Sequence, residues 1–165
     1  MAYRTKTYIA GDWDNDKDVV DQLIKWNDSD YWGLSFNNAH DLTKARDDSL
    51  PCSIKSSLAE RLDASKTFVL IIGSETKSRR AGECNYCKIL FNCTQNKSNK
   101  SYIEYECDKA IRDEIKIVVI YKAATVDKSK CLDSIKYSGT HIALYNIVNG
   151  KYELNYQEIK SAIEK

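Results

Sequence analysis

The residues best suited to chemistry are a tyrosine and a glutamate four positions apart, Tyr102 and Glu106. They follow Ser101, which has the spacing of a helix capping box with Glu104. Residues four apart share one face of a helix, so the ring and the carboxylate are expected to lie together. An aromatic ring beside a carboxylate at the mouth of an α/β sheet suits chemistry on a sugar or a nucleotide. We therefore interpret the chain as an enzyme with Glu106 as its candidate catalytic residue.

The segments around this pair alternate between strand and helix patterns. The apolar run 68–72 is typical of a strand buried on both faces. A second face of the helix, with Ile103, Cys107, Ala110 and Ile111, is expected to pack against the sheet. The patterns predict strands at 5–10, 34–36, 67–73, 115–121 and 140–148, and helices at 17–27, 51–65, 101–114, near 127–136 and at 156–165.

Five strands alternating with helices predict an α/β fold with a doubly wound, five-stranded, mainly parallel sheet. Right-handed crossovers place helices on both faces, and the flavodoxin-like strand order is 2-1-3-4-5. Ligands bind such sheets at the carboxyl ends of strands one and three. The candidate substrate-binding residues expected near that crevice are Tyr102, Gly11, Asp12, Ser74, Asp41 and Arg46.

Several of these residues have a simpler structural interpretation. Asp12 could contact a ribose, whereas Asp14 and Asp16 suit helix capping and solvation. Asp41 and the histidine before it have the composition of a catalytic dyad, but no nucleophile elbow lies nearby, so we prefer a role in ordering the loop. Arg46 could meet a pyrophosphate, although a surface ion pair is the commoner role of an arginine.

Length and charge narrow the class of protein. The 165 residues predict one domain, 1–165. Lys plus Arg number 25 and Asp plus Glu 24, and this balance argues against a nucleic-acid partner because no excess of positive charge meets phosphates. The longest apolar run is far too short to span a membrane, and the first residues lack the apolar stretch of a secretory signal. We expect a cytoplasmic protein with no membrane partner.

Three of the six cysteines lie in a polar insert at about 77–100. Cys84 and Cys87 form one C-x-x-C pair, and Cys93 follows six residues later. A structural zinc site needs four ligands, which Cys107 or Cys52 would have to complete. Zinc is therefore an open alternative, but we favour reduced thiols and expect no resident cofactor.

Four segments, in order along the chain, resemble a known family. They are YIAGDWDND, FNNAHDLTKARDDS, SIKSSLAERLDASKTFVLIIGSETKS and YIEYECDKAIRDEIKIVVIY. Together they resemble the TIR-like family whose best-known members are the ThsB subunits of bacterial Thoeris anti-phage systems. The resemblance spans most of residues 3–121, and the last 40 residues match only at the level of fold.

The resemblance implies an activity. TIR enzymes carry an aromatic residue four positions before a catalytic glutamate, and Tyr102 and Glu106 occupy those positions. It implies NAD+ as substrate, cleavage of the nicotinamide–ribose bond, and a cyclic ADP-ribose-type or ADP-ribose-conjugate signal that activates a partner effector. Glu106 would stabilise the positive charge that develops on the ribose. Self-association or a phage-derived trigger would control the activity.

Two other functions compete with this one. The first is a non-enzymatic TIR-like adaptor that acts by self-association. The second is another doubly wound module, a flavodoxin or a phosphoacceptor receiver. The acidic loop after the first strand would repel a flavin phosphate, and the third strand ends in Gly73 and Ser74 where a receiver needs an aspartate. We therefore keep the adaptor as the main alternative.

Overall fold

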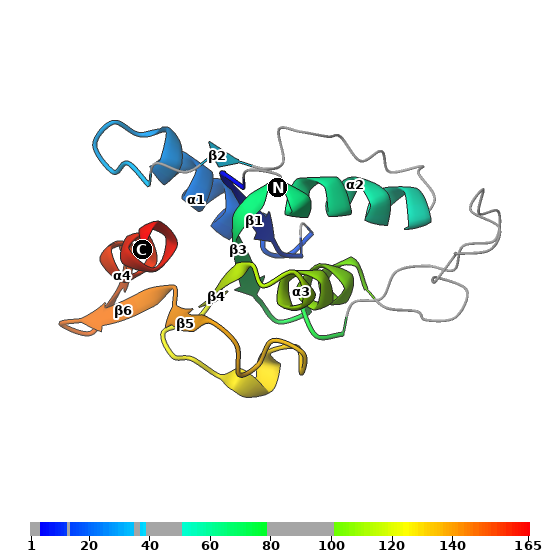
Figure 1. Ribbon diagram of the computed structural model, residues 1–165. Coiled ribbons are helices and arrows are strands. Elements are labelled where there is room, and N and C mark those ends of the chain that lie inside the picture. Colours follow the sequence, from blue (N-terminus) through cyan, green and yellow to red (C-terminus); the bar gives the residue numbers. More distant parts are fainter. Residues whose placement is uncertain (1–3, 13, 35–36, 39–50, 79–100) are drawn as a thin grey trace.

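The computed structural model describes residues 4–12, 14–34, 37–38, 51–78 and 101–165 (Figure 1). In chain order the elements are β1 (Lys6–Ala10), α1 (Lys17–Asp28), β2 (Asn37–Asn38), α2 (Pro51–Asp63), β3 (Ser65–Ile72), α3 (Tyr102–Arg112), β4 (Lys116–Tyr121), the 3-10 helix η3 (Lys128–Lys130), β5 (Thr140–Ala143), β6 (Tyr145–Val148), β7 (Lys151–Leu154) and α4 (Tyr156–Glu164). Among these residues, no helix is both long and apolar enough to cross a bilayer.

The main sheet has the order β2-β1-β3-β4-β5, and every pairing within it is parallel. β2 contributes only two residues, so β1, β3, β4 and β5 form the body of the sheet. Parallel strands require crossover connections, and helices supply several of them. The predicted α/β class is confirmed.

The two faces of the sheet are covered by different helices. Side chains alternate along β3, so Phe68 and Leu70 join the core under α2 and α3, whereas Val69 and Ile71 join the core under α1 and α4. Figure 1 shows these two pairs of helices on opposite sides of the strands. A sheet that is buried on both faces requires strands that are apolar at every position, and residues 68–72 meet this requirement.

The single strand predicted at 140–148 is wrong. β5 ends at Ala143, and β6 leaves the main sheet to pair antiparallel with β7. Asn149 and Gly150 connect β6 to β7 and have φ angles of 51° and 76°. An Asn-Gly pair takes up this left-handed conformation at low cost, and it gives the turn whose twist suits a hairpin. The predicted helix near 127–136 is also shorter than expected, because only η3 forms there.

Other predicted boundaries differ less. The strand predicted at 34–36 falls partly outside the described residues, and the short strand β2 instead occupies 37–38. Cys84, Cys87 and Cys93 lie outside the described residues. Of the two remaining zinc candidates, Cys107 is a buried free thiol, and the side chain of Cys52 is not described.

Candidate functional site

The helix that carries Glu106 begins as its sequence predicts. The Ser101 hydroxyl accepts a hydrogen bond from the Glu104 backbone N–H at 3.1 Å, and the Glu104 carboxylate accepts one from the Ser101 N–H at 2.9 Å. These two bonds satisfy donors that a helix end otherwise leaves unpaired. They fix the start of α3, and with it the position of Glu106 one turn later.

Glu106 points into the protein interior. Its residue is 6% exposed and lies on the face of α3 that also buries Ile103, Cys107 and Ala110. Glu106 stands three residues after Ile103 and four before Ala110, which is the spacing of a helix face packed against a sheet. Ile111, which the sequence placed on the packing face, is instead exposed. The carboxylate therefore belongs to the buried face of the helix.

The partner of the Glu106 carboxylate is a tyrosine from the sheet. The Tyr8 hydroxyl, on β1, donates a hydrogen bond to Glu106 Oε1. Tyr8 is fully buried, and its ring stacks on Phe68 of β3. Tyr102, the ring expected beside the carboxylate, is half-buried and packs against the core cluster under α3. Sequence reasoning missed Tyr8, because a contact between residues 98 positions apart leaves no periodic signal.

Burial dominates the electrostatics of this pair. It raises the pKa of Glu106 from its ordinary value of 4.5 to about 8, although the hydrogen bond from Tyr8 and the charge of Arg61 act in the opposite direction. Burial and the neighbouring Glu106 likewise raise the pKa of Tyr8 well above its ordinary value. At pH 7 the protonated form of Glu106 therefore predominates. Arg61 comes from α2 and is itself buried.

A buried lysine braces α2 and α3 on the side of Glu106 away from the capping box. Lys109 Nζ lies 2.6 Å from Asp63 Oδ1, at the end of α2, and 2.6 Å from Asp113 Oδ2, just past the end of α3. Two carboxylates around one buried ammonium compensate for its lost hydration. The brace holds the two helices that place Arg61 and Glu106 together.

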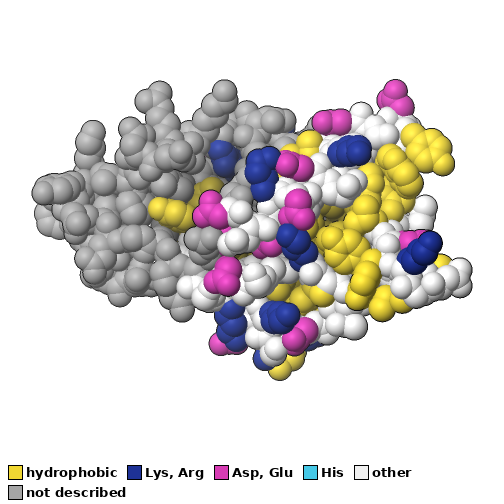
Figure 2. All heavy atoms as spheres, turned by 180° about the vertical axis from the view of Figure 1, so that it is seen from behind, with side chains coloured by type: hydrophobic (Ala, Val, Ile, Leu, Met, Phe, Trp, Pro, Cys, Tyr) yellow, Lys and Arg dark blue, Asp and Glu magenta, His cyan; other side chains and the backbone are white. Residues whose placement is uncertain are grey.

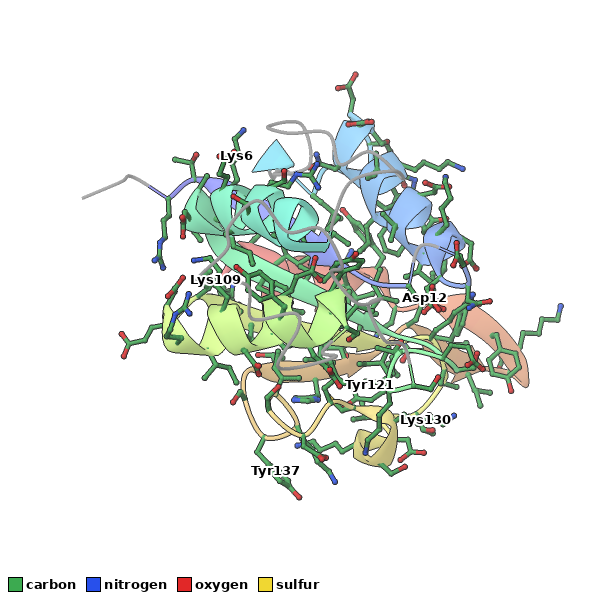
Figure 3. All side chains as sticks on the ribbon, turned by 90° about the vertical axis from the view of Figure 1, so that its right-hand side faces the viewer. Lys6, Asp12, Lys109, Tyr121, Lys130 and Tyr137 are labelled. Carbon is green, nitrogen blue, oxygen red and sulfur yellow. The ribbon has the colours of Figure 1, made fainter. Side chains whose placement is uncertain are left out.

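The remaining predicted residues lie at the carboxyl edge of the sheet or outside the described chain. Figure 3 shows Asp12 towards this edge, with Tyr121 and Lys130, and Lys109 towards the opposite edge. Asp12 is buried and accepts hydrogen bonds from the Asp14 N–H and the Asn15 side chain, at 3.1 and 2.8 Å. It thus orders the turn after β1.

Gly11 is buried against Ile71, and a Cβ added to it would lie 3.4 Å from the Ile71 Cβ. This is ordinary contact, so the position does not demand glycine for space. Asp41 and Arg46 lie outside the described residues.

A cavity of about 430 Å³ opens at the carboxyl ends of β3 and β4. Its lining includes Ser74, but not Gly11, Asp12, Tyr102 or Glu106. The structure therefore divides the predicted site residues. Ser74 faces this cavity, whereas Glu106 lies between α3, α2 and β1.

Asp16 is a second buried carboxylate that sequence reasoning assigned to capping or solvation. It occupies the N-cap position of α1, but its side chain makes no capping hydrogen bond. Its residue is 1% exposed, and Asp16 Oδ1 lies 3.7 Å from Lys122 Nζ. Burial raises the pKa of Asp16, and the charge of Lys122 lowers it. The solvated interpretation is therefore wrong.

The N-terminal part of the chain matches a known family. Residues 7–83 match the family model described as Thoeris protein ThsB, TIR-like domain. The chain resembles ThsB. The match covers just under half of the 165 residues and includes Tyr8, Asp16 and Arg61, but it ends before Tyr102 and Glu106. The ThsB resemblance inferred from sequence segments is thus confirmed over 7–83, and the candidate catalytic residue lies beyond it.

A solved structure shares the fold over nearly the whole chain. A conserved protein from Enterococcus faecalis V583 is similar with a TM-score of 0.52 and 10% sequence identity, over 98% of this chain and 98% of that one. At this identity the likeness shows the α/β fold alone. No curated protein matches the ThsB-like chain significantly.

Proposed function

We propose that this ThsB-like chain is an NAD+-consuming enzyme of Thoeris anti-phage defence. It cleaves the nicotinamide–ribose bond and makes a cyclic ADP-ribose-type signal, or an ADP-ribose conjugate, that activates a partner effector. One observation carries the proposal: a buried carboxylate on α3, Glu106, whose pKa is raised to about 8 and which a tyrosine from the sheet holds in place. Strongly perturbed carboxyl groups held by specific partners are typical of catalytic sites.

The reaction needs a negative charge close to the ribose. When the bond between the ribose C1′ and the pyridine nitrogen breaks, both electrons leave with nicotinamide, which departs as a neutral molecule. The positive charge moves to the ribose, and the Glu106 carboxylate stabilises it. A nucleophile then adds to C1′ and loses a proton. Water gives ADP-ribose, whereas a group within the same molecule gives a cyclic product.

The high pKa of Glu106 fits a carboxyl group that ionises when its substrate arrives. NAD+ carries its positive charge on the nicotinamide ring, and a cation near a carboxyl group lowers the pKa of that group. Substrate therefore favours the charged form that the reaction uses. In the free enzyme, kcat/KM should rise with pH towards the pKa of about 8, because only the ionised fraction is productive.

The residues in contact with Glu106 and the other residues predicted from the sequence have roles in this proposal. Tyr8 orients the carboxylate, and the charge of Arg61 favours its ionised form. Tyr102, Gly11, Asp12, Asp41 and Arg46 are proposed to bind substrate, and Ser74 is proposed to bind it only from the separate cavity that Ser74 lines. The enzyme would act in the cytoplasm, without a resident cofactor or zinc, and a phage-derived trigger or self-association would switch it on.

An exposed apolar surface favours a second candidate, a TIR-like adaptor that works by assembly. On the described part of the face in Figure 2, hydrophobic side chains gather towards the right of the view. Tyr31 is 86% exposed, and Trp32 beside it packs edge-on against Tyr156 of α4 at 4.9 Å between ring centroids. Tyr152 and Ile147 of the hairpin are also exposed. Large exposed aromatic surfaces commonly mark protein contacts.

Mass spectrometry of nucleotides from phage-infected cells separates the two candidates. Cells that express the wild-type chain should accumulate a new ADP-ribose species, and cells that express Glu106→Gln should not. Glu164→Gln, at the exposed end of α4, is the matched control and should behave as wild type. If protection against phage persists in Glu106→Gln with no new nucleotide in either strain, the adaptor replaces the enzyme.

A further inference from the structure

The cavity at the carboxyl ends of β3 and β4 is a candidate binding site separate from Glu106. Its volume of about 430 Å³ lies within the range of small-ligand sites. The turn after β1 contributes Asp16, the end of β3 contributes Gly73 and Ser74, and the segment after β4 contributes Lys122 and Thr125. The carboxyl edge of a parallel sheet is the usual place for ligands in this fold class.

One residue of the cavity lining, Asp16, carries a buried oxygen without a partner. Asp16 Oδ2 has no hydrogen-bond partner, although the residue is almost fully inaccessible. The oxygen does not cap α1, and its neighbour Oδ1 is 3.7 Å from Lys122 Nζ. A buried acceptor left unpaired destabilises the fold, so a site that keeps one is expected to receive a donor from a ligand or a water molecule.

Gly73 makes room for this carboxylate. A Cβ added at Gly73 would lie 2.2 Å from both oxygens of Asp16, far inside contact distance. Gly73 also lines the cavity, and its backbone N–H donates to the Thr76 hydroxyl at 2.8 Å. The backbone at the end of β3 is therefore fixed in a position where any other residue would displace the Asp16 side chain.

The charges in the lining point to the class of ligand. The lining contains two acidic residues, Asp16 and Asp127, and two basic ones, Lys122 and Lys130, so it has no formal net charge. A phosphate in this cavity would be repelled by the two carboxylates, and a metal ion would be repelled by the two ammonium groups. Hydroxyl groups fit both, because each can donate to a carboxylate and accept from a lysine.

We propose that this cavity binds the vicinal hydroxyl groups of a sugar, with the Asp16 carboxylate as their acceptor. Asp16 Oδ2, the oxygen without a partner, has two lone pairs and can accept hydrogen bonds from two adjacent hydroxyl groups. Such a diol occurs in free sugars and in the ribose of nucleotides. The site does not depend on the catalytic role of Glu106, which is not part of its lining.

Amide chemical shifts of the 15N-labelled full chain test the site. D-ribose and adenosine are titrated separately, with 2′,3′-dideoxyadenosine as the analogue that lacks the diol. Saturable shifts at Gly73, Ser74 and Thr125 are expected with at least one diol, and the dideoxy analogue should bind at least about tenfold more weakly. Binding of both diols indicates a site for sugars in general, and binding of adenosine alone indicates a site for nucleosides.

Variants separate the site from non-specific effects. Asp16→Ala should weaken binding about tenfold or more, and Asp28→Ala, which removes an exposed carboxylate from the end of α1, should not. If Asp16→Ala does not fold, Thr125→Trp tests the site instead. Thr125 is exposed and lines the cavity, so a tryptophan there should fill the cavity and weaken binding of the diols. Glu106→Gln should bind the diols as wild type does, even if it abolishes NAD+ cleavage.

Three results would overturn the proposal. The first is the absence of saturable shifts at these amides with either diol, which would mean that the cavity holds water only. The second is equal binding of adenosine and its dideoxy analogue. The third is unchanged affinity in the folded Asp16→Ala protein, or in Thr125→Trp. None of these results bears on whether Glu106 cleaves NAD+.

Discussion

Replacing Glu106 by glutamine should change how the stability of the protein depends on pH. The native state holds a proton on Glu106 up to a pKa of about 8, whereas an ordinary glutamate releases it at 4.5. Below pH 4.5 the group is neutral in both the folded and the unfolded chain. Between these two values the folded state binds more protons than the unfolded state, so stability falls as pH rises.

The size of the effect follows from the same two values. A shift of one pKa unit corresponds to about 1.4 kcal/mol, but the group is only half titrated at either end of the interval, so the wild type should lose about 4 kcal/mol of stability from pH 4.5 to 8 through this group alone. Glutamine has no proton to release but can still accept the hydrogen bond from Tyr8. The Glu106→Gln protein should be spared this loss and become the more stable of the two at pH 8.

Urea denaturation at intervals from pH 4.5 to 8 measures this difference. The free energies of unfolding of wild type and Glu106→Gln should diverge as pH rises, while Glu164→Gln should follow the wild type. Because other groups titrate in both proteins, only the difference between the curves is interpreted. Parallel curves across the whole range would show that Glu106 is solvated, and the buried site described above would be wrong.

Three further substitutions test the surroundings. Gly73→Ala should lower the free energy of unfolding by about 1–3 kcal/mol in urea denaturation, because its Cβ would overlap the Asp16 carboxylate; unchanged stability would place Asp16 elsewhere. Ser101→Ala should cost about 1 kcal/mol by the same measurement, because it removes the hydroxyl of the capping box; no loss would mean that water caps α3 equally well. Tyr8→Phe removes a hydrogen bond that lowers the pKa of Glu106, so the pH at which the stability stops falling should move upwards; a shift to lower pH would contradict that role.

The elements that the sequence predicted well depend on local signals. The apolar run of β3 and the capping box of α3 are visible in a few consecutive residues. The Asn149–Gly150 turn is equally local, and the hairpin could have been predicted from it. The long apparent strand obscured this turn, because apolar residues, interrupted by Asn146, continue to Val148 after β5 has ended at Ala143.

The burial of Glu106 and its contact with Tyr8 could not be predicted from a short sequence pattern. The pairing with Tyr102 at four residues suggested one shared face, yet Glu106 also stands three residues after Ile103 and four before Ala110. That second spacing places it on the buried face, where the structure puts it. The contact with Tyr8 depends on how α3 lies across β1, which is decided by tertiary packing.

The burial of Asp16 was also beyond sequence patterns. An aspartate before a helix is most often a cap, and Asp16 does stand at the N-cap position. What turns its side chain inwards is the space left by Gly73, which lies 57 residues further along the chain, and the approach of Lys122 from the end of β4.

The most direct test of the catalytic claim is the release of nicotinamide from NAD+ in lysates of phage-infected cells that express the chain. Wild type and Glu164→Gln should release nicotinamide at similar rates that rise from pH 6 towards about pH 8, and Glu106→Gln at equal protein level should release none above background. Equal release by wild type and Glu106→Gln would mean that another group performs the cleavage, and no release from any of them would remove the enzymatic function.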